Sequence, residues 1–435
     1  HYPLRRQRQM CIRDRFARIA SKIGLKEGDD LGALEDARWF GRELDDSDAA
    51  ELSQMLRAQP LPSLKYLKLF GNKLSSEGIS SLAAAIPSLS GLERFDLDNN
   101  TSDDVDIHDA TRMGVQRSGN HIGDSGAEAL TAALMATPVP SLKALNMAGN
   151  GIGDRGAAAL CALLRSSSIS EMNLIRNTFS AATALELAKT AVQSGRAVIF
   201  CSGLSGLNAD ATVASLVSSD LSDPDGVLLA GTLHMRGAMP NITELRLHDN
   251  LLGDSTASAL ADVIASGVLP SLLTLTLNCN CIGDEGFAAF ANLMRPGSAL
   301  SRLESLGLRQ NLLSDHSMAA LANCLGDGAM PALQQLLLGN NALTADGIIQ
   351  LAATLKEGKS LTALRVLELQ KNNIGDAGAE ALAQAIAGGA LPQLRELYLF
   401  HNALTMAGEI AVKSTGAPQL TRVVASLPKM FDDDE

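Results

Sequence analysis

Two stretches of the sequence gather side chains that could bind a cation. Cys279 and Cys281 flank Asn280, and thiolates are ligands for zinc and other soft metals. A structural zinc site needs a second pair of ligands, which a lone C-x-C does not supply, so the competing interpretation is two small residues beside a loop asparagine. The segment 101–120 carries an acidic cluster with a histidine: Asp103, Asp104, Asp106, His108 and Asp109.

The same segment 101–120 interrupts a regular pattern, so we interpret it as an insertion in the loop that leaves a strand. Inserted loops on a rigid scaffold often carry function, which favours a loop that binds a cation or a partner. The alternatives are a solvated, mobile loop and an unspliced intervening sequence.

No constellation typical of a catalytic site occurs in the sequence. The phosphate-binding pattern GxxxxGK[ST] and the zinc-protease pattern HExxH are absent. Beyond His1 the histidines are scattered, at His108, His121, His234, His248, His316 and His401. The repeated D-x-G aspartates coincide with expected helix starts, where a carboxylate caps the helix. We therefore predict no catalytic residues, no bound metal and no cofactor.

These side chains belong to a pattern that recurs at nearly constant spacing. The unit L-x-x-L-x-L-x-x-N-x-(L/I)-x-D-x-G-A repeats in steps of 30 or 31 residues in the second half of the chain. Its first apolar position falls at Ile242, Leu272, Leu303, Leu333, Leu364 and Leu394. A fixed period of this size indicates a solenoid of repeated units.

Each unit predicts a strand, a loop, a helix and a return. The alternating L-x-L is typical of a half-buried strand, and the alanine-rich run after it has helical spacing. The predicted helix caps include Asp154, Asp284, Asp376, Ser76 and Thr405. The loop asparagine can both donate and accept, which suits a turn through the interior. Because strands stack about 4.8 Å apart and helices need about 8–10 Å, the strands must line the inside of a curve.

The pattern resembles the leucine-rich repeat family, and within it the ribonuclease-inhibitor-like class, which is similar to the repeat region of NOD-like receptors. The resemblance rests on L-x-x-L-x-L-x-x-N and covers nearly the whole chain. It implies an α/β fold, a leucine-rich repeat solenoid or horseshoe with parallel strands on the concave face and helices on the convex face. It implies function only weakly, because one fold serves many functions.

The repeat also predicts how the chain is divided. Residues 1–15, HYPLRRQRQMCIRDR, resemble a translated sequencing adaptor and are expected to be foreign, the alternative being a short basic arm that binds an acidic partner. The expected order is then a lead-in at 16–33, a leucine-rich repeat domain at 34–427 and an acidic tail at 428–435. Within the domain we expect an N-terminal cap repeat at 34–63, the inserted loop at 101–120, a degenerate join at 195–240 that splits the stack, regular repeats at 242–419 and a terminal strand at 420–427.

Composition favours an acidic, cytoplasmic protein. The net charge of −12 argues against nucleic acid and against anionic membranes as partners. The sequence contains no recognisable secretory signal and no apolar run long enough to span a bilayer. Outside the first residues the cysteines are odd in number and irregularly spaced, which favours a reducing compartment over a disulfide framework.

Side chains that alternate with the strand leucines are expected to face solvent inside the curve. The candidate partner-binding residues among them are Tyr66, Phe70, Asp96, Asp98, Arg246, His248, Arg309, Glu368, Tyr398 and Phe400. The aromatic members fall near the two ends of the predicted arc, and aromatic and Arg residues are common interface anchors. The competing interpretation is that singly exposed apolar residues are normal on a protein surface.

We therefore predict a non-enzymatic scaffold that binds a partner protein on the concave face. The alternative is a GTPase-activating protein similar to the activator of Ran, a family with similar repeats and an acidic C-terminal region. That family's acidic region is longer than the DDDE found here, and no motif specific to the family maps onto this sequence. A third possibility is an assembly element of the cytoskeleton or cilium.

Overall fold

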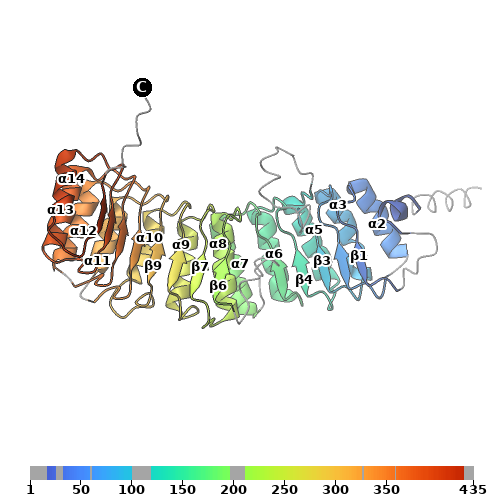
Figure 1. Ribbon diagram of the computed structural model, residues 1–435. Helices are drawn as coiled ribbons and strands as arrows, with labels where there is room; N and C mark the ends of the chain where they lie inside the picture. Colours follow the sequence, from blue (N-terminus) through green and yellow to red (C-terminus); the bar gives the residue numbers. More distant parts are fainter. Residues whose placement is uncertain are drawn as a thin grey trace, which may run out of the picture. The chain divides into compact units, whose positions relative to one another are not determined.

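The computed structural model describes residues 17–25, 33–58, 61–99, 119–195, 211–325, 328–357 and 359–425. Strands and helices alternate along them, and the chain forms two compact units, His1–Cys201 (unit 1) and Ser202–Glu435 (unit 2). Figure 1 shows that the strands of each unit follow one another in chain order. Within the described residues, no helix has both the length and the apolar character needed to cross a bilayer.

Unit 1 is built on one parallel sheet. Its strands are β1 (Asp36–Arg38), β2 (Tyr66–Lys68), β3 (Arg94–Asp96), β4 (Ala144–Asn146) and β5 (Glu171–Asn173), paired in that order. Its helices are α2 (Asp46–Ala58), α3 (Ser76–Ala83), the 3-10 helix η2 (Ile86–Ser88), α5 (Gly123–Ala136), α6 (Asp154–Ser166) and α7 (Ala181–Ser194). The register aligns one buried side chain from each strand: Ala37, Leu67, Phe95, Leu145 and Met172.

Unit 2 is built on a longer parallel sheet. Its strands are β6 (Val213–Ser215), β7 (Glu244–Arg246), β8 (Thr274–Thr276), β9 (Ser305–Gly307), β10 (Gln335–Leu337), β11 (Val366–Glu368), β12 (Glu396–Tyr398) and β13 (Arg422–Val424), again paired in chain order. Its helices are α8 (Asp223–Arg236), α9 (Asp254–Ala265), α10 (Asp284–Asn292), α11 (Asp315–Cys324), α12 (Ala345–Glu357), α13 (Gly375–Ala387) and α14 (Met406–Lys413).

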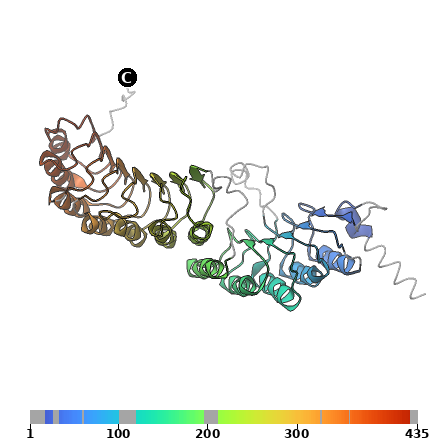
Figure 2. The same ribbon diagram turned by 90° about the horizontal axis from the view of Figure 1, so that it is seen from below.

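Each unit separates its strands from its helices. In Figure 2 the helices of unit 1 lie on one side of its strands, and the strands of unit 2 line the inner side of a curve with the helices outside. The core between the layers consists of the repeated leucines, such as Leu245, Leu275 and Leu306, which are buried. Strand spacing is shorter than helix spacing, which accounts for the direction of the curve. The predicted α/β repeat solenoid is confirmed.

After most strands, a buried or half-buried asparagine joins its repeat to the neighbouring repeats. Asn280 donates from Nδ2 to the carbonyl oxygens of Leu247 and Leu277, both at 3.0 Å, and its Oδ1 accepts from the Leu252 N–H at 3.0 Å. The same role is filled by Asn72, Asn120, Asn150, Asn177, Asn250, Asn311, Asn341, Asn372 and Asn402. Leaving such buried backbone groups unpaired costs about 1–3 kcal/mol each, so this ladder fixes the loop.

The hydrogen bonds of Asn120 correct the C-terminal boundary of the insertion predicted at 101–120. Its amide donates to the carbonyl oxygens of Leu69 (2.9 Å) and Leu97 (3.0 Å), and its Oδ1 accepts from the Leu74 N–H (3.1 Å). It therefore occupies the ladder position that the regular spacing assigns to Asn100. The insertion ends before Asn120, and its acidic cluster lies outside the described residues.

The aspartates at the helix starts do not cap their own helices, contrary to the sequence-based prediction. Asp284 is the first residue of α10, and its Oδ1 accepts from the backbone N–H groups of Ser314 (2.9 Å) and Ser317 (3.1 Å) at the start of the next helix, α11. Asp154 and Asp376 likewise reach the N-cap residues of α7 and α14. The carboxylate points along the stack, where the next helix presents unpaired N–H groups.

The hydrogen bonds affect the titration of these carboxyl groups. Burial raises the pKa of Asp284, but the hydrogen bonds from Ser314 and Ser317 lower it more, so the pKa lies below its ordinary value.

Of the two other predicted helix caps, one is confirmed and one is displaced by a residue. Ser75 rather than Ser76 is the N-cap of α3, whereas Thr405 is the N-cap of α14 and accepts from the Ala407 N–H, as predicted.

The predicted subdivisions can be compared with the described elements. The cap repeat at 34–63 contains β1 and α2, the join at 195–240 contains β6 and α8, and the terminal stretch 420–427 contains β13. The two units meet in sequence at Cys201 and Ser202, inside the predicted join. Residues 1–15 and 428–435 lie outside the described residues.

Candidate functional site

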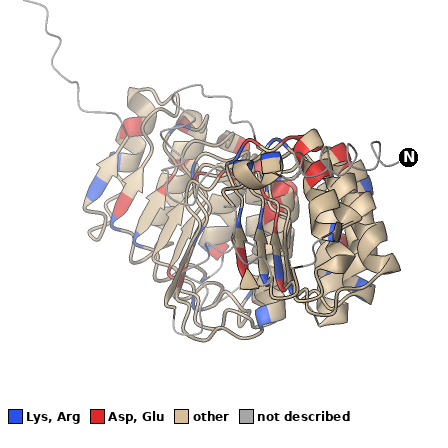
Figure 3. Cartoon of the chain, turned by 90° about the vertical axis from the view of Figure 1, so that its right-hand side faces the viewer, with Lys and Arg blue, Asp and Glu red and all other residues tan. Residues whose placement is uncertain are grey.

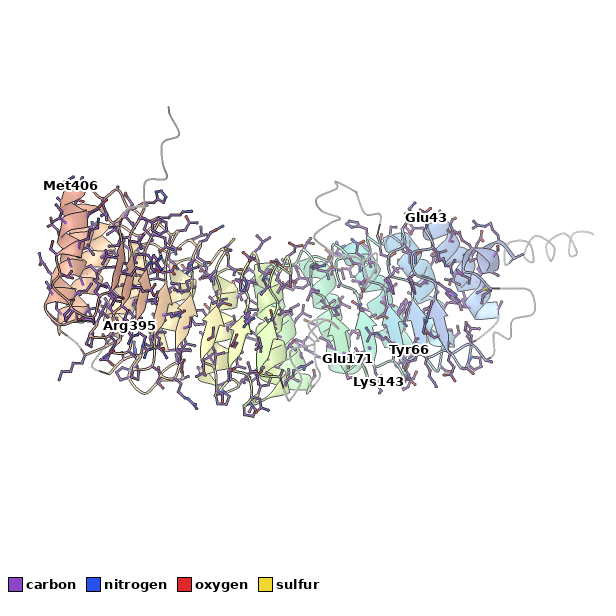
Figure 4. All side chains as sticks on the ribbon, viewed as in Figure 1. Glu43, Tyr66, Lys143, Glu171, Arg395 and Met406 are labelled. Atoms are coloured by element: carbon purple, nitrogen blue, oxygen red, sulfur yellow. The ribbon has the colours of Figure 1, made fainter. Side chains whose placement is uncertain are left out.

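Each unit has a strand face, formed by the side chains that alternate with the buried leucines. In unit 1 this face carries an aromatic cluster, which we define as Phe40, Tyr66 and Phe70. The rings of Phe40 and Phe70 stack, with centroids 4.5 Å apart and planes 5° apart. Phe40 and Tyr66 remain 40% and 38% exposed. Figure 4 labels Tyr66 beside the strands of unit 1.

Phe40 was not among the sequence-based candidates. It follows β1 at the position that Phe70 occupies after β2, thirty residues earlier in the chain. Phe40 was missed because the first repeat matches the sequence pattern only weakly. The thirty-residue period, counted back from Phe70, was sufficient to identify it. The stacked pair exposes a rigid apolar surface with few rotatable bonds, which is the property that makes aromatic residues effective binding anchors.

Asp96 on β3 and Asp98, two residues after it, differ in exposure. Asp96 is only 5% exposed, and the Arg94 Nε lies 2.9 Å from its Oδ1. The expectation that Asp96 faces solvent is therefore wrong, because the neighbouring Arg94 covers it. Asp98 is half-buried and accepts from the Asn146 Nδ2 at 2.6 Å. Lys68 places its Nζ 5.9 Å from the ring centre of Tyr66.

In unit 2, Arg309 and Glu368 are joined by an ion pair that crosses an intervening strand. Arg309 follows β9 and Glu368 lies on β11, so the guanidinium passes over β10. Gly339 permits close packing here, since a Cβ at this position would lie 2.6 Å from the Gln370 Nε2. Glu368 is 8% exposed, which corrects the expectation that it projects into solvent.

Tyr398 and Phe400 lie next to this pair on β12 and in the residues after it. The register places Tyr398 beside Glu368, and the Arg422 guanidinium lies 5.3 Å from the Tyr398 ring centre. The Tyr398 hydroxyl donates to Glu396, and this hydrogen bond, together with burial, raises the pKa of Tyr398. The Phe400 ring meets His401 edge to face at 5.4 Å. Both aromatics are half-buried, so only part of each side chain is exposed to solvent.

Arg246 and His248 form a separate position near the start of the unit 2 sheet. Arg246 on β7 forms an ion pair with Glu244 of the same strand. The His248 Nδ1 lies 3.2 Å from the Thr276 hydroxyl oxygen. The structure therefore brings the predicted residues together in three groups, one in unit 1 and two in unit 2. Figure 3 shows acidic and basic residues on the strands as well as on the helices.

The cysteine pair around the ladder Asn280 is not part of a ligand cluster. Among the described residues, no group of three His, Cys, Asp or Glu side chains could hold a metal ion. Burial raises the pKa of the Cys279 thiol, and the nearby Asp249 carboxylate raises it further. A thiol with a raised pKa is less often ionised and is a weaker ligand and nucleophile.

The fold is a solenoid of short repeats. Its parallel strands pair in chain order, a helix follows nearly every strand, and an asparagine ladder joins the loops. A family model for the Leucine Rich repeat matches residues 61–83, 118–130, 140–161, 268–291 and 360–383. The protein is a leucine-rich repeat protein. Among solved structures it is similar to an internalin (inlF) from Listeria monocytogenes str. 4b F2365, at 16% identity, with 93% of this chain and 92% of that chain covered and a TM-score of 0.31.

Proposed function

We propose that this protein is a non-enzymatic scaffold that binds a partner protein on its strand face. The observation that carries the proposal is the stacked Phe40–Phe70 pair, of which Phe40 is 40% exposed and Phe70 is half-buried, on the same strand face as the exposed Tyr66. An aromatic pair left in water forgoes burial worth about 25 cal/mol per Å², and a protein surface in contact with it would recover that free energy. The repeat length of 30 or 31 residues, with a helix in each repeat, supports placing the protein in the ribonuclease-inhibitor-like class of leucine-rich repeats.

The rigidity of the repeats supports this role. The asparagine ladder and the aspartate bridges tie neighbouring loops of the described repeats together, so we expect the strand face to change little in shape on binding. In unit 2, Tyr398 and Phe400 are the corresponding aromatic anchors, held beside the Arg309–Glu368 ion pair. We further propose a reducing, cytoplasmic location, supported by the free thiols of Cys161, Cys279, Cys281 and Cys324.

The test is a pull-down from cell lysate with matched variants, followed by mass spectrometry of the captured proteins. The Phe40→Ala, Phe70→Ala double variant removes the stacked pair. The control variant Leu251→Ala, Leu312→Ala removes equally apolar side chains that are 60% and 63% exposed in unit 2. Circular dichroism checks that both variants are folded.

A specific partner that is bound by the wild type and the control, and at least about tenfold less by the Phe variant, supports the proposal. Equal capture by all three proteins contradicts it. Recovery of a Ran-like GTPase would instead favour the GTPase-activating alternative, which predicts faster GTP hydrolysis by that GTPase when the protein is added. The variant Tyr398→Ala, Phe400→Ala tests the anchors of unit 2 in the same assay.

A further inference from the structure

The residue just before each strand belongs to a continuous row, which we call the entry row. Neighbours in the row are joined directly, because the carbonyl oxygen of each accepts the backbone N–H of the next. In unit 1 the row is Glu35, Lys65, Glu93, Lys143 and Ser170. In unit 2 it is Thr212, Thr243, Leu273, Glu304, Gln334, Arg365, Arg395 and Thr421.

The entry row of unit 1 alternates in charge. Lys65 lies between Glu35 and Glu93, and the Lys65 Nζ is 3.0 Å from the Glu35 Oε2. Lys143 follows Glu93. Opposite charges on neighbouring strands attract, so this row is neutralised by its own members and has little remaining charge to offer a ligand.

The entry row of unit 2 places two like charges side by side. The Arg395 N–H donates to the Arg365 carbonyl oxygen at 2.8 Å, so the two residues are neighbours on adjacent strands. Both side chains are exposed, and neither forms an ion pair or a side-chain hydrogen bond within the described residues. Like charges in neighbouring positions destabilise a sheet.

The residues around the arginine pair do not neutralise it. Its neighbours in the row are the uncharged Gln334 and Thr421. Glu396, the residue after Arg395, already accepts the Tyr398 hydroxyl and lies 3.9 Å from the Arg422 guanidinium. Arg422 thus adds a third cation on the next strand, 62% exposed. Figure 4 labels Arg395 among the strands of unit 2.

We infer that Arg365 and Arg395 bind the carboxylates of an acidic segment in the partner protein. Each guanidinium offers a planar fork that matches a carboxylate. Alternate acidic side chains of an extended peptide lie on one face about 7 Å apart, a separation that two long arginine side chains on strands about 4.8 Å apart can match. The net charge of −12 disfavours a long polyanion such as nucleic acid, whereas a short acidic segment meets only this local positive patch. The inference rests on the proposed protein-binding function and specifies the chemistry of the partner.

The probe is a fluorescein-labelled peptide with six consecutive glutamates between glycine–serine ends, titrated by fluorescence anisotropy with the full chain at low salt. The variant Arg365→Gln, Arg395→Gln removes the pair. The control Arg295→Gln, Arg302→Gln removes the same charge from two exposed arginines elsewhere in unit 2. We expect at least tenfold weaker binding for the first variant and less than twofold change for the control.

Equal loss in both variants would show attraction by net charge alone and would overturn the inference, as would failure of the wild type to bind the peptide. Displacement by inorganic phosphate at matched ionic strength, but not by sodium chloride, would also overturn it in favour of a phosphate site. The peptide assay reports on the arginine pair and the pull-down on the aromatic cluster, so failure of one is distinguishable from failure of the other.

A third variant, Arg365→Glu, reproduces in unit 2 the alternating charge of unit 1. It should abolish binding of the glutamate peptide and raise the melting temperature of unit 2 by about 1 °C, because repulsion is replaced by attraction. A melting temperature that falls would contradict the claim that the pair is electrostatically unsatisfied.

Discussion

Units 1 and 2 form the turn after each strand with different residues. At most positions of the asparagine ladder, the residue that leads into the turn has a positive φ. In unit 1 this residue is often glycine, as at Gly41, Gly71 and Gly149, whereas in unit 2 it carries a side chain: Asp249, Cys279, Gln310, Asn340, Lys371 and His401. A residue with a Cβ loses about 1–2 kcal/mol in this conformation. Unit 2 therefore displays a row of side chains at the expense of its own stability, whereas among these positions unit 1 does so at Arg176.

The largest expected effect tests whether the two units have independent cores. Phe95 in unit 1 and Phe287 in unit 2 are completely buried. Replacing either with alanine should lower the free energy of unfolding of its own unit by about 3–5 kcal/mol, because a large cavity remains. Hydrogen exchange measured by mass spectrometry should show loss of protection in the mutated unit alone. Equal loss in both units would mean that the chain unfolds as one body.

An intermediate effect concerns the aspartate bridge between α10 and α11 in unit 2. Replacing Asp284 with alanine should cost about 1–2 kcal/mol at pH 7, since the start of α11 loses its acceptor. The pKa of Asp284 is lowered in the folded state, so its contribution is complete above the unfolded pKa near 4 and is lost as the pH falls through the folded pKa. Thermal unfolding from pH 7 to pH 3 should show the variant and wild type converging in acid. A constant difference would assign the effect to packing.

The smallest expected effect tests the difference in turn residues between the two units. Gly71→Ala should destabilise unit 1 by about 1 kcal/mol, because alanine is strained at a φ of 64°. Gln310→Gly, at a φ of 52°, should be neutral or stabilise unit 2 by up to about 0.5 kcal/mol. Denaturant unfolding of each unit measures both changes. If Gln310→Gly is destabilising, the side chain makes a favourable contact that outweighs the strain.

The leucine period was sufficient to predict the strands, the helices and the asparagine ladder, because each depends on residues within one repeat. Features that depend on a neighbouring repeat were not predictable in this way. Asp284 caps the helix of the next repeat, and Asn120 closes a ladder position across the insertion. Glu368 is covered by Arg309 from two strands away. The sequence indicated that these polar residues matter, but not which partner each would meet.

The direction of the aspartate bridges makes the two sides of each bridged junction unlike. The carboxylate of Asp254 points forward to the N–H of Gly283, and that of Asp284 points forward to Ser314. If the chain were cut between two repeats, one cut surface would carry bare carboxylates and the other the positive start of a helix. Fragments would then rejoin head to tail, and two identical cut surfaces would repel. The stack of repeats therefore has a direction, which the aspartate bridges set from the N-terminal to the C-terminal repeat.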